Sequence, residues 1–272
     1  MLSIEGLTKW YGQTCAVEDL SLHIAPGEIF GFIGHNGAGK TTTLKCVVGI
    51  LGFDAGEIRI DGLSVRESAL GESVRGVREK TLGGANVRGV RESVLGGDKD
   101  GRGRDSALEC KRRIAYIPDN PDLYDFMSGI KYLNFIADIF EVPMPERVAR
   151  IEKYASLFEM GDVLGNPISS YSHGMKQKLA IISAWVHAPK LIIMDEPFVG
   201  LDPKASHILK GMMRSFCDAG SAIFFSTHVL EVAEKLCDKV AIIKDGKLIR
   251  CGTMDEVKGD ESLEEVFLEL VD

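Results

Sequence analysis

Residues 34–41 read Gly34-His35-Asn36-Gly37-Ala38-Gly39-Lys40-Thr41, which is a glycine, four further residues, and then Gly-Lys-Thr. A short apolar run at 28–33 precedes this stretch, as expected of a buried parallel strand. The run at 42–48 reads as the first turns of a helix. A strand, a glycine-rich loop and a helix are together the setting in which this motif marks a phosphate site.

The chemistry of such a loop follows from its geometry. Glycines let the backbone curl so that successive N–H groups converge, and the helix N-terminus adds partial positive charge at the same place. Lys40 can reach the β- and γ-phosphates of a nucleotide, and the Thr41 hydroxyl can occupy one Mg²⁺ position. The plainer alternative is a tight strand-to-helix turn with an incidental lysine, and the flanking strand and helix argue against it.

Composition limits the class of protein. The chain has 272 residues, of which 45% are hydrophobic, enough for one large α/β core with a satellite subdomain. The net charge of −8 does not indicate a basic face that would bind nucleic acid. Six scattered cysteines favour reduced thiols in a cytosolic protein over a zinc cluster or a disulfide framework. No secretory leader and no membrane-spanning run is visible, so we expect another chain to supply any membrane span.

Short apolar bursts between residues 2 and 24 predict antiparallel strands that turn near Tyr11 and Gly12. Tyr11 lies ahead of the phosphate loop, so its ring is a candidate to stack on an adenine. Packing on the sheet is the more frequent role of a lone aromatic residue. A further short strand near 57–60 places Ile58 and Ile60 on one face.

The stretch from about residue 71 to 108 differs from the rest of the chain. It has no aromatic residue, many glycines and charges of both signs, and it repeats itself, since Gly76-Val77-Arg78-Glu79 returns as Gly89-Val90-Arg91-Glu92. This composition predicts a mobile insert without which the chain still folds. An arm that contacts RNA or lipid through its arginines is the alternative, and the nearby acidic residues disfavour it.

Regular structure is expected again from residue 114. Residues 114–118 predict a strand that a proline stops, and Asp119 follows it. Apolar residues at helical spacing predict helices over 124–140 and roughly 146–160. We therefore expect an inserted helical subdomain over 120–168.

Two further stretches carry candidate chemistry. Ser172 is a good N-cap for a helix that ends near Pro189, and on its own a cap is all that this serine needs to be. An apolar strand over 191–196 ends in Asp195 and Glu196, and a buried parallel strand delivers such residues to the ligand edge of its sheet. Asp195 can hold a magnesium-bound water and Glu196 can accept a proton from an attacking water, whereas a solvated strand end is the plain alternative.

The C-terminal part contains another apolar strand, which ends at His228. A lone histidine is more often structural, but the mouth of a strand in a phosphate-loop sheet makes His228 a stronger candidate. The run 240–249 around Asp245 and Gly246 predicts a β-hairpin, and 263–270 predicts an amphipathic helix.

Together these pieces resemble the ATP-binding cassette of ABC transporters over nearly the whole chain, apart from the insert. Six features stand in the family's order: aromatic Tyr11, Walker A at 34–41, the signature at 171–177, Walker B at 190–196, the turn at 201–202, and His228 after a final strand. Each feature is weak alone, and the ordered set is highly specific. The ending at 262–270, with no permease in the same chain, looks like the stand-alone cassettes of bacterial export systems, whose substrates include antibiotics, peptides and lipids.

The resemblance implies a fold and a set of site residues. The fold is α/β, with a P-loop NTPase core built on a mainly parallel sheet, an N-terminal antiparallel β subdomain and an inserted helical subdomain, all within one nucleotide-binding domain over 1–272. The implied catalytic residues are Lys40, Glu196 and His228, and the implied Mg²⁺ ligands are Thr41, Asp119 and Asp195. The residues implied in ATP binding are Tyr11, Gly34, His35, Asn36, Gly37, Ala38, Gly39, Lys40, Thr41 and Thr42.

The resemblance also implies partners. A second cassette closes head-to-tail on ATP, as a homodimer or heterodimer, and brings its signature to the first one's nucleotide; the signature residues here are Ser172, His173, Gly174 and Met175. Glu196 activates or orients water, His228 contacts the γ-phosphate and that water, and hydrolysis loosens the dimer. The helical subdomain passes this motion to an integral membrane permease, which places the cassette at the cytoplasmic face of the membrane. Candidate contacts with the permease are Tyr124, Phe126 and Met127, for which core packing is an equal alternative.

Three features depart from the family's pattern. Asp119 stands where a glutamine is usual; it still offers oxygen to Mg²⁺, directly or through water, and it adds negative charge near the phosphates. His173 replaces a glycine of the signature and adds bulk and a titratable group; because Ser172 and Gly174 remain, we expect a working variant. The insert either crowds the face near Asp119 or extends into solvent.

Three other functions remain as alternatives. A soluble cassette protein acting on nucleic acid or ribosomes usually carries a long coiled-coil insertion or two cassettes, and neither is present, so no nucleic-acid partner is expected. A regulatory module that does not hydrolyse ATP would predict loss of Lys40, Glu196 or His228, and all three are present. A kinase or GTPase lacks support, since no Asn-Lys-x-Asp guanine motif occurs and neither class predicts the signature.

Overall fold

The computed structural model describes residues 1–65 and 102–271. In that part of the chain, the first sheet is antiparallel, comes from the N-terminal end and has the strand order β2-β1-β4-β5. Alternation along the chain explains it, because Ile58 and Ile60 are fully buried and Arg59 between them is exposed. The strands are β1 (Leu2–Tyr11), β2 (Thr14–Ile24), β4 (Ala55–Ile60) and β5 (Leu63–Ser64).

The second sheet has six strands in the order β10-β9-β3-β8-β7-β6. Neighbours pair in parallel except β9 and β10, which form the hairpin expected around Asp245 and Gly246. The predicted α/β core with a mainly parallel sheet and the N-terminal antiparallel subdomain are therefore confirmed. The strands are β3 (Ile29–Ile33), β6 (Ile114–Ile117), β7 (Leu191–Asp195), β8 (Ala222–Thr227), β9 (Lys239–Lys244) and β10 (Lys247–Thr253).

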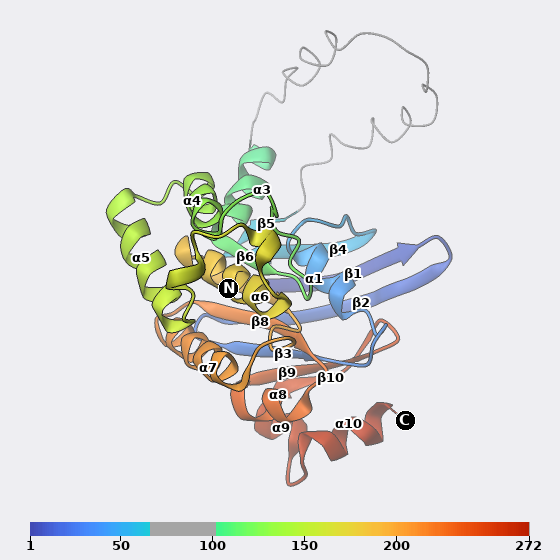
Figure 1. Cartoon of the computed structure of the whole chain (residues 1–272). Helices are drawn as coiled ribbons and strands as arrows, with labels where there is room; N and C mark the ends of the chain where they lie inside the picture. Colours follow the sequence, from blue (N-terminus) through green and yellow to red (C-terminus); the bar gives the residue numbers. More distant parts are fainter. Residues whose placement is uncertain (66–101, 272) are drawn as a thin grey trace.

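The second sheet is buried on both faces, and β3 shows how. Ile29 and Ile33 point into a core shared with the helices α6 (His173–Val186), α7 (Pro203–Asp218) and α8 (Leu230–Leu236). Phe30 and Phe32 point into a core shared with helix α1 (Lys40–Val47) and the first sheet. All five residues of β3 are buried, as expected of a central parallel strand. The layers are thus the first sheet, α1, the second sheet and the outer helices (Figure 1).

The helices arise mainly where apolar residues recur at helical spacing. The bounds are α1 (Lys40–Val47), α3 (Arg102–Arg113), α4 (Gly129–Ile139), α5 (Met144–Leu157), α6 (His173–Val186), α7 (Pro203–Asp218), α8 (Leu230–Leu236), α9 (Met254–Lys258) and α10 (Leu263–Val271). The range 120–168 contains α4 and α5, which lie together at one side of the molecule (Figure 1). None of the helices within 1–65 and 102–271 combines the length and apolarity needed to cross a membrane.

One expected helix begins later than predicted. The apolar spacing suggests a helix over 124–140, but α4 begins at Gly129. The backbone of 124–128 pairs with a distant segment instead: the Ile168 N–H donates to the Met127 carbonyl and the Ser169 N–H to the Asp125 carbonyl. A long-range pairing of this kind leaves no trace in local periodicity.

The insert is also shorter at its C-terminal end than its composition predicts. Residues 102–108 belong to helix α3, where Ala107 is buried and the Ser106 hydroxyl donates to the Ser64 carbonyl at 3.0 Å. The rest of the expected insert, 71–101, lies outside the described residues.

Candidate functional site

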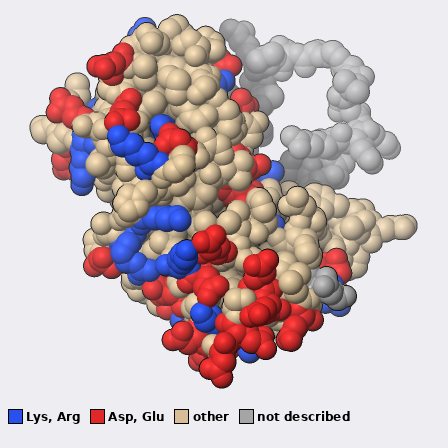
Figure 2. All heavy atoms as spheres, turned by 60° about the horizontal axis from the view of Figure 1, so that its bottom comes forward, with Lys and Arg blue, Asp and Glu red and all other residues tan. Residues whose placement is uncertain are grey.

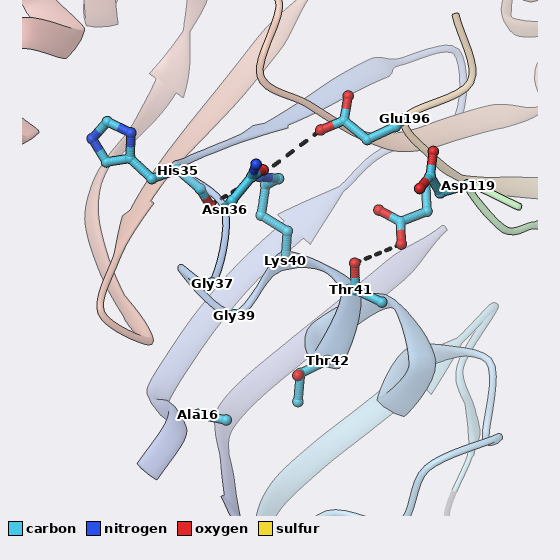
Figure 3. Close-up of a pocket in the computed structure, with 11 residues that line it drawn as sticks. Ala16, His35, Asn36, Gly37, Gly39, Lys40, Thr41, Thr42, Asp119 and Glu196 are labelled. Atoms are coloured by element: carbon cyan, nitrogen blue, oxygen red, sulfur yellow. Dashed lines mark hydrogen bonds and ion pairs between the residues drawn. The ribbon is translucent and has the colours of Figure 1, made fainter. Parts of the chain in front are cut away.

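The candidate site lies where the carboxyl ends of four parallel strands meet. Ile33 at the end of β3 pairs with Thr227 at the end of β8, and Asp195 at the end of β7 pairs with Ser226. This register brings the phosphate loop, the two carboxylates and the segment after β6 to one edge of the sheet. They enclose a pocket of about 250 Å³ (Figure 3), lined by Ala16, His35, Asn36, Gly37, Gly39, Lys40, Thr41, Thr42, Asp119, Asp195 and Glu196.

The loop between β3 and α1 has the shape that its glycines permit. Gly37 and Gly39 have φ of 85° and 104°, a region that side chains disfavour. At Gly39 a Cβ would also lie 2.4 Å from the Ala16 carbonyl oxygen, so only glycine fits. Helix α1 starts directly after Gly39 and no side chain caps it, so its first N–H groups remain available for an anion.

Lys40 points into the loop from the first position of α1. Its Nζ donates to the Gly34 carbonyl at 2.6 Å and to the His35 carbonyl at 3.1 Å, and it lies 3.9 Å from Glu196 Oε1 (Figure 3). Burial lowers the pKa of Lys40, while the carboxylates of Glu196 and Asp195 oppose that shift. The ammonium group is thus held by two backbone acceptors and lies beside the Glu196 carboxylate, at the place where a phosphate would bring more negative charge.

A set of oxygen atoms lies beside Lys40. Thr41 Oγ1 donates to Asp195 Oδ2 at 2.6 Å, and the Ser226 hydroxyl donates to Asp195 Oδ1. Asp119 lines the same pocket and Asp195 is only 3% exposed. Hydroxyl and carboxylate oxygens are the donors that Mg²⁺ prefers, and it needs only one or two from the protein when phosphates supply others. The residues present therefore fit a magnesium ion.

Glu196 follows β7 in a left-handed conformation with φ of 47°. Its N–H bonds to the carbonyl and to the hydroxyl of Ser226, both at 3.2 Å. Its Oε1 lies 2.9 Å from His228 Nδ1, and the His228 N–H donates to Oε2 at 3.4 Å. The carboxylate is therefore held at the pocket between a buried lysine and a histidine, with a geometry that suits a base or a water-orienting group.

The signature residues lie outside the pocket lining. Ser172 is the expected N-cap of α6, since its side chain accepts from the Met175 N–H at 3.3 Å. His173 lies against Gly200, where a Cβ would come 2.5 Å from the ring carbon Cδ2. The bulk that His173 adds to the signature is thus accommodated by a glycine, which stands at φ 78°.

The structure brings together most, but not all, of the predicted site residues. Gly34 and Ala38 form the loop without lining the pocket, and His228 reaches it through Glu196. Tyr11 is 51% exposed at the end of β1, with Lys9 Nζ 5.6 Å from its ring centroid, and it does not line the pocket.

Two residues of the site are not predicted from the sequence. Ala16 lines the pocket from β2, and Ser226 orients both Asp195 and Glu196. Ala16 carries no chemical signal, because its backbone carbonyl makes the close approach. The hydroxyl at the end of the strand 222–227 was the signal that could have identified Ser226.

Comparison with known proteins gives one family. A model of the family described as ABC transporter matches residues 17–199. The ABC transporter ATP-binding protein all4389 of Nostoc sp. is 31% identical over 93% of this chain, which spans only 64% of that relative's length. The Nod factor export ATP-binding protein I of Ralstonia nicotianae is 29% identical over 94% of this chain and 68% of its own length. A solved structure of an ATP binding subunit of an ABC transporter is similar with a TM-score of 0.83 and 29% identity, and the match covers 99% of both chains.

Proposed function

Since this chain belongs to the ABC transporter family, as an ATP-binding subunit, we propose that it hydrolyses ATP to power a separate membrane permease. The observation that carries the proposal is the convergence of Lys40, Thr41, Asp195 and Glu196 on one pocket, although they come from two distant parts of the chain. A lone phosphate-loop turn would not need two acids and a histidine at the same edge.

Each group has a role that its position supports. Lys40 and the N-terminus of α1 neutralise the charge of the β- and γ-phosphates. Thr41, Asp195 and Asp119 would hold Mg²⁺, which when bound supplies further neutralisation of phosphate charge. Glu196 orients or deprotonates the attacking water, and His228 fixes the Glu196 carboxylate through the 2.9 Å contact.

A second cassette completes the site in this proposal. Ser172, His173, Gly174 and Met175 do not line the pocket of their own chain. They lie at the N-terminus of α6, a 14-residue helix, and the partial positive charge of that helix end suits the phosphates of a partner's nucleotide. Two such domains, packed head-to-tail, would each supply half of two sites.

The permease partner and the direction of transport are part of the same proposal. Tyr124 and Phe126 are 47% and 81% exposed in the turn before α4, with their ring centroids 5.8 Å apart. Such exposed aromatic residues suit a partner chain. Met127 packs against the core instead. The relative named for Nod factor export supports export as the direction of transport. In this proposal the cargo is a drug, peptide or lipid, and the permease would hold this chain at the cytoplasmic face of the membrane.

The test is ATP binding and phosphate release by the purified chain with Mg²⁺. We expect Lys40→Ala to reduce hydrolysis by roughly 100-fold or more, the usual cost of removing one preorganised group that stabilises transition-state charge. Lys45→Ala, five residues further along α1 and outside the pocket lining, is the matched control and should behave as the wild type. The proposal fails if the wild type neither binds nor hydrolyses ATP, or if both variants behave alike.

A further inference from the structure

The turn between β9 and β10 contacts the back of the phosphate loop. It is a two-residue turn, Asp245-Gly246, with φ of 49° and 79°. The Gly246 N–H donates to the Ala38 carbonyl at 3.0 Å, and the Gly246 carbonyl accepts from the Glu18 N–H at 2.9 Å. A Cβ at Gly246 would lie 2.9 Å from the Ala16 carbonyl oxygen. The turn is therefore wedged between the loop and the start of β2.

The loop itself is fitted to this support. A Cβ at Gly34 would lie 2.6 Å from the Ile243 carbonyl oxygen, so the first glycine of the motif rests on the end of β9. A Cβ at Gly39 would lie 3.5 Å from the Gly246 Cα. Neither Ile243 nor Gly246 lines the pocket, so these contacts support the loop without touching what it binds.

The C-terminal helix makes a second contact with the loop. The Phe267 ring of α10 meets the His35 ring edge-on, with centroids 5.0 Å apart and planes at 65°. Phe267 is only 7% exposed, and Leu263 and Val266 of the same helix are also buried. Acidic side chains gather on the outer face of the part of the molecule that contains α10 (Figure 2). The His35 side chain points away from Lys40 and Glu196 (Figure 3). The apolar side of α10 thus holds one end of the loop.

We propose that Gly246 and Phe267 are positioning residues for nucleotide binding, which act by holding the backbone of the phosphate loop. Both lie beyond residues 17–199, the part that matches the family model. The inference rests on the proposed function, since it assigns a role toward the nucleotide. A loop fixed in advance loses less freedom when it closes around phosphate, so weakening the support lowers affinity. Ser226 holds Asp195 and Glu196 at the end of β7. Weakening the support of the phosphate loop leaves these hydrogen bonds in place, so KM should change more than kcat.

The chain offers a matched pair of variants. Gly246 and Gly62 are each the second residue of an Asp-Gly hairpin turn, with φ of 79° and 80°. Alanine is strained equally in both turns, but at Gly62 a Cβ meets nothing within 4 Å. We expect Gly246→Ala to raise the Kd and KM for ATP about tenfold, while Gly62→Ala changes them less than about twofold and kcat of both stays within about threefold.

The second contact has its own variants. Phe267→Ala should raise the KM for ATP severalfold, and Phe267→Tyr, which keeps the ring, should restore it. Leu268→Ala, at a neighbouring position that is 50% exposed, is the control on the same helix. Melting temperatures of all variants, measured with and without ATP, distinguish a loss of ATP affinity from a loss of stability.

The outcomes separate this inference from the function on which it rests. If wild type hydrolyses ATP and Gly246→Ala matches Gly62→Ala, the support is not used and the inference is overturned while the function stands. The same holds if Phe267→Ala matches Leu268→Ala. If wild type binds no ATP, both proposals fall. A raised KM in Gly246→Ala and Phe267→Ala, with kcat retained, supports the inference.

Discussion

In the proposed function, the chemistry of the pocket depends most on Glu196. Its left-handed backbone costs roughly 1 kcal/mol for a residue other than glycine, and its two hydrogen bonds to Ser226 offset that cost. The conformation turns the side chain out of the line of β7, toward Lys40 and His228. Strain that persists beside such partners indicates a position kept for function.

We expect Glu196→Gln to reduce the rate of phosphate release roughly 1,000-fold, while the affinity for ATP stays within a fewfold of that of the wild type. Glutamine keeps the shape but cannot accept a proton, and it removes a negative charge beside the phosphates. The measurement is single-turnover phosphate release together with ATP binding, with Glu231→Gln on the exposed surface of α8 as control. Undiminished phosphate release in Glu196→Gln would show that another group handles the water.

At this scale the sequence predicts side chains with distinctive chemistry and misses those that act through pairing. Lys40, Thr41, Asp195 and Glu196 belong to motifs, and the structure brings all four to one pocket. Ser226 acts only because β7 and β8 pair with Asp195 opposite it, a register that no local pattern specifies.

Among the elements, the β4–β5 turn is tied to the rest of the chain by charge. Asp61 in this turn accepts from Lys190 at 2.8 Å, just before β7, and from Arg113 at the end of α3. The hydrogen bond from Lys190 is the main cause that lowers the pKa of the Asp61 carboxyl, and the charges of Lys190 and Arg113 add to it. The pair of contacts joins the first sheet to α3 and β7.

Asp61→Asn should lower the free energy of unfolding at pH 7 by about 0.5 kcal/mol, since solvent screens a carboxylate that is 36% exposed. Because the folded-state pKa is depressed, this stability is present above the unfolded pKa of about 4 and is lost as the pH falls through the folded value. The difference from wild type should therefore vanish at low pH. Asparagine tolerates the φ of 52°, so only charge changes.

Urea unfolding from pH 7 downward measures the effect. Asp245→Asn is the control, since Asp245 occupies the same place in the β9–β10 turn and makes no ion pair within the described ranges. A difference between Asp61→Asn and wild type that persists unchanged at pH 2.5 would contradict a role for the Asp61 charge.

Element types were predicted better than element ends. The strands over 28–33, 114–118 and 191–196 and the hairpin at 245–246 follow from apolar runs and turn residues. The start of α4 does not, because Ser128 forms an isolated bridge with Pro167, a residue of the segment that pairs with 124–128. A helix loses its first turn when distant backbone offers its carbonyls better partners.

For the whole molecule, the order of elements explains why a binding pocket exists at all. The second sheet separates two cores, and β3, β6, β7 and β8 end at one edge of it. From that edge β3 leads to α1 in one core, whereas β7 and β8 lead to α7 and α8 in the other core. The family resemblance predicts this arrangement, while the contact of the C-terminal third with the phosphate loop emerges only from the structure. Contacts between segments some 200 residues apart have no local signature.

The ends of the expected insert give a prediction about the whole chain. Ser106 Oγ bonds to the Ser64 carbonyl, and Cys110 Sγ approaches the Leu63 carbonyl at 3.4 Å, so α3 returns directly to β5. At 1.5 Å per helical residue, Arg102 is about 6 Å along the axis from Ser106. The five residues 66–70 can span roughly 17 Å, which suffices to join the two sides.

We therefore expect deletion of 71–101 to leave the melting temperature and ATP hydrolysis close to wild type. Deletion of 71–108 should cost about 1–3 kcal/mol, because it removes buried Ala107 and leaves the Ser64 carbonyl without the Ser106 hydroxyl. Thermal unfolding and soluble yield compare the two deletions, and each serves as the control for the other. Equal stability of the two would mean that the first turns of α3 contribute nothing, whereas collapse of both would place residues 71–101 within the folded core.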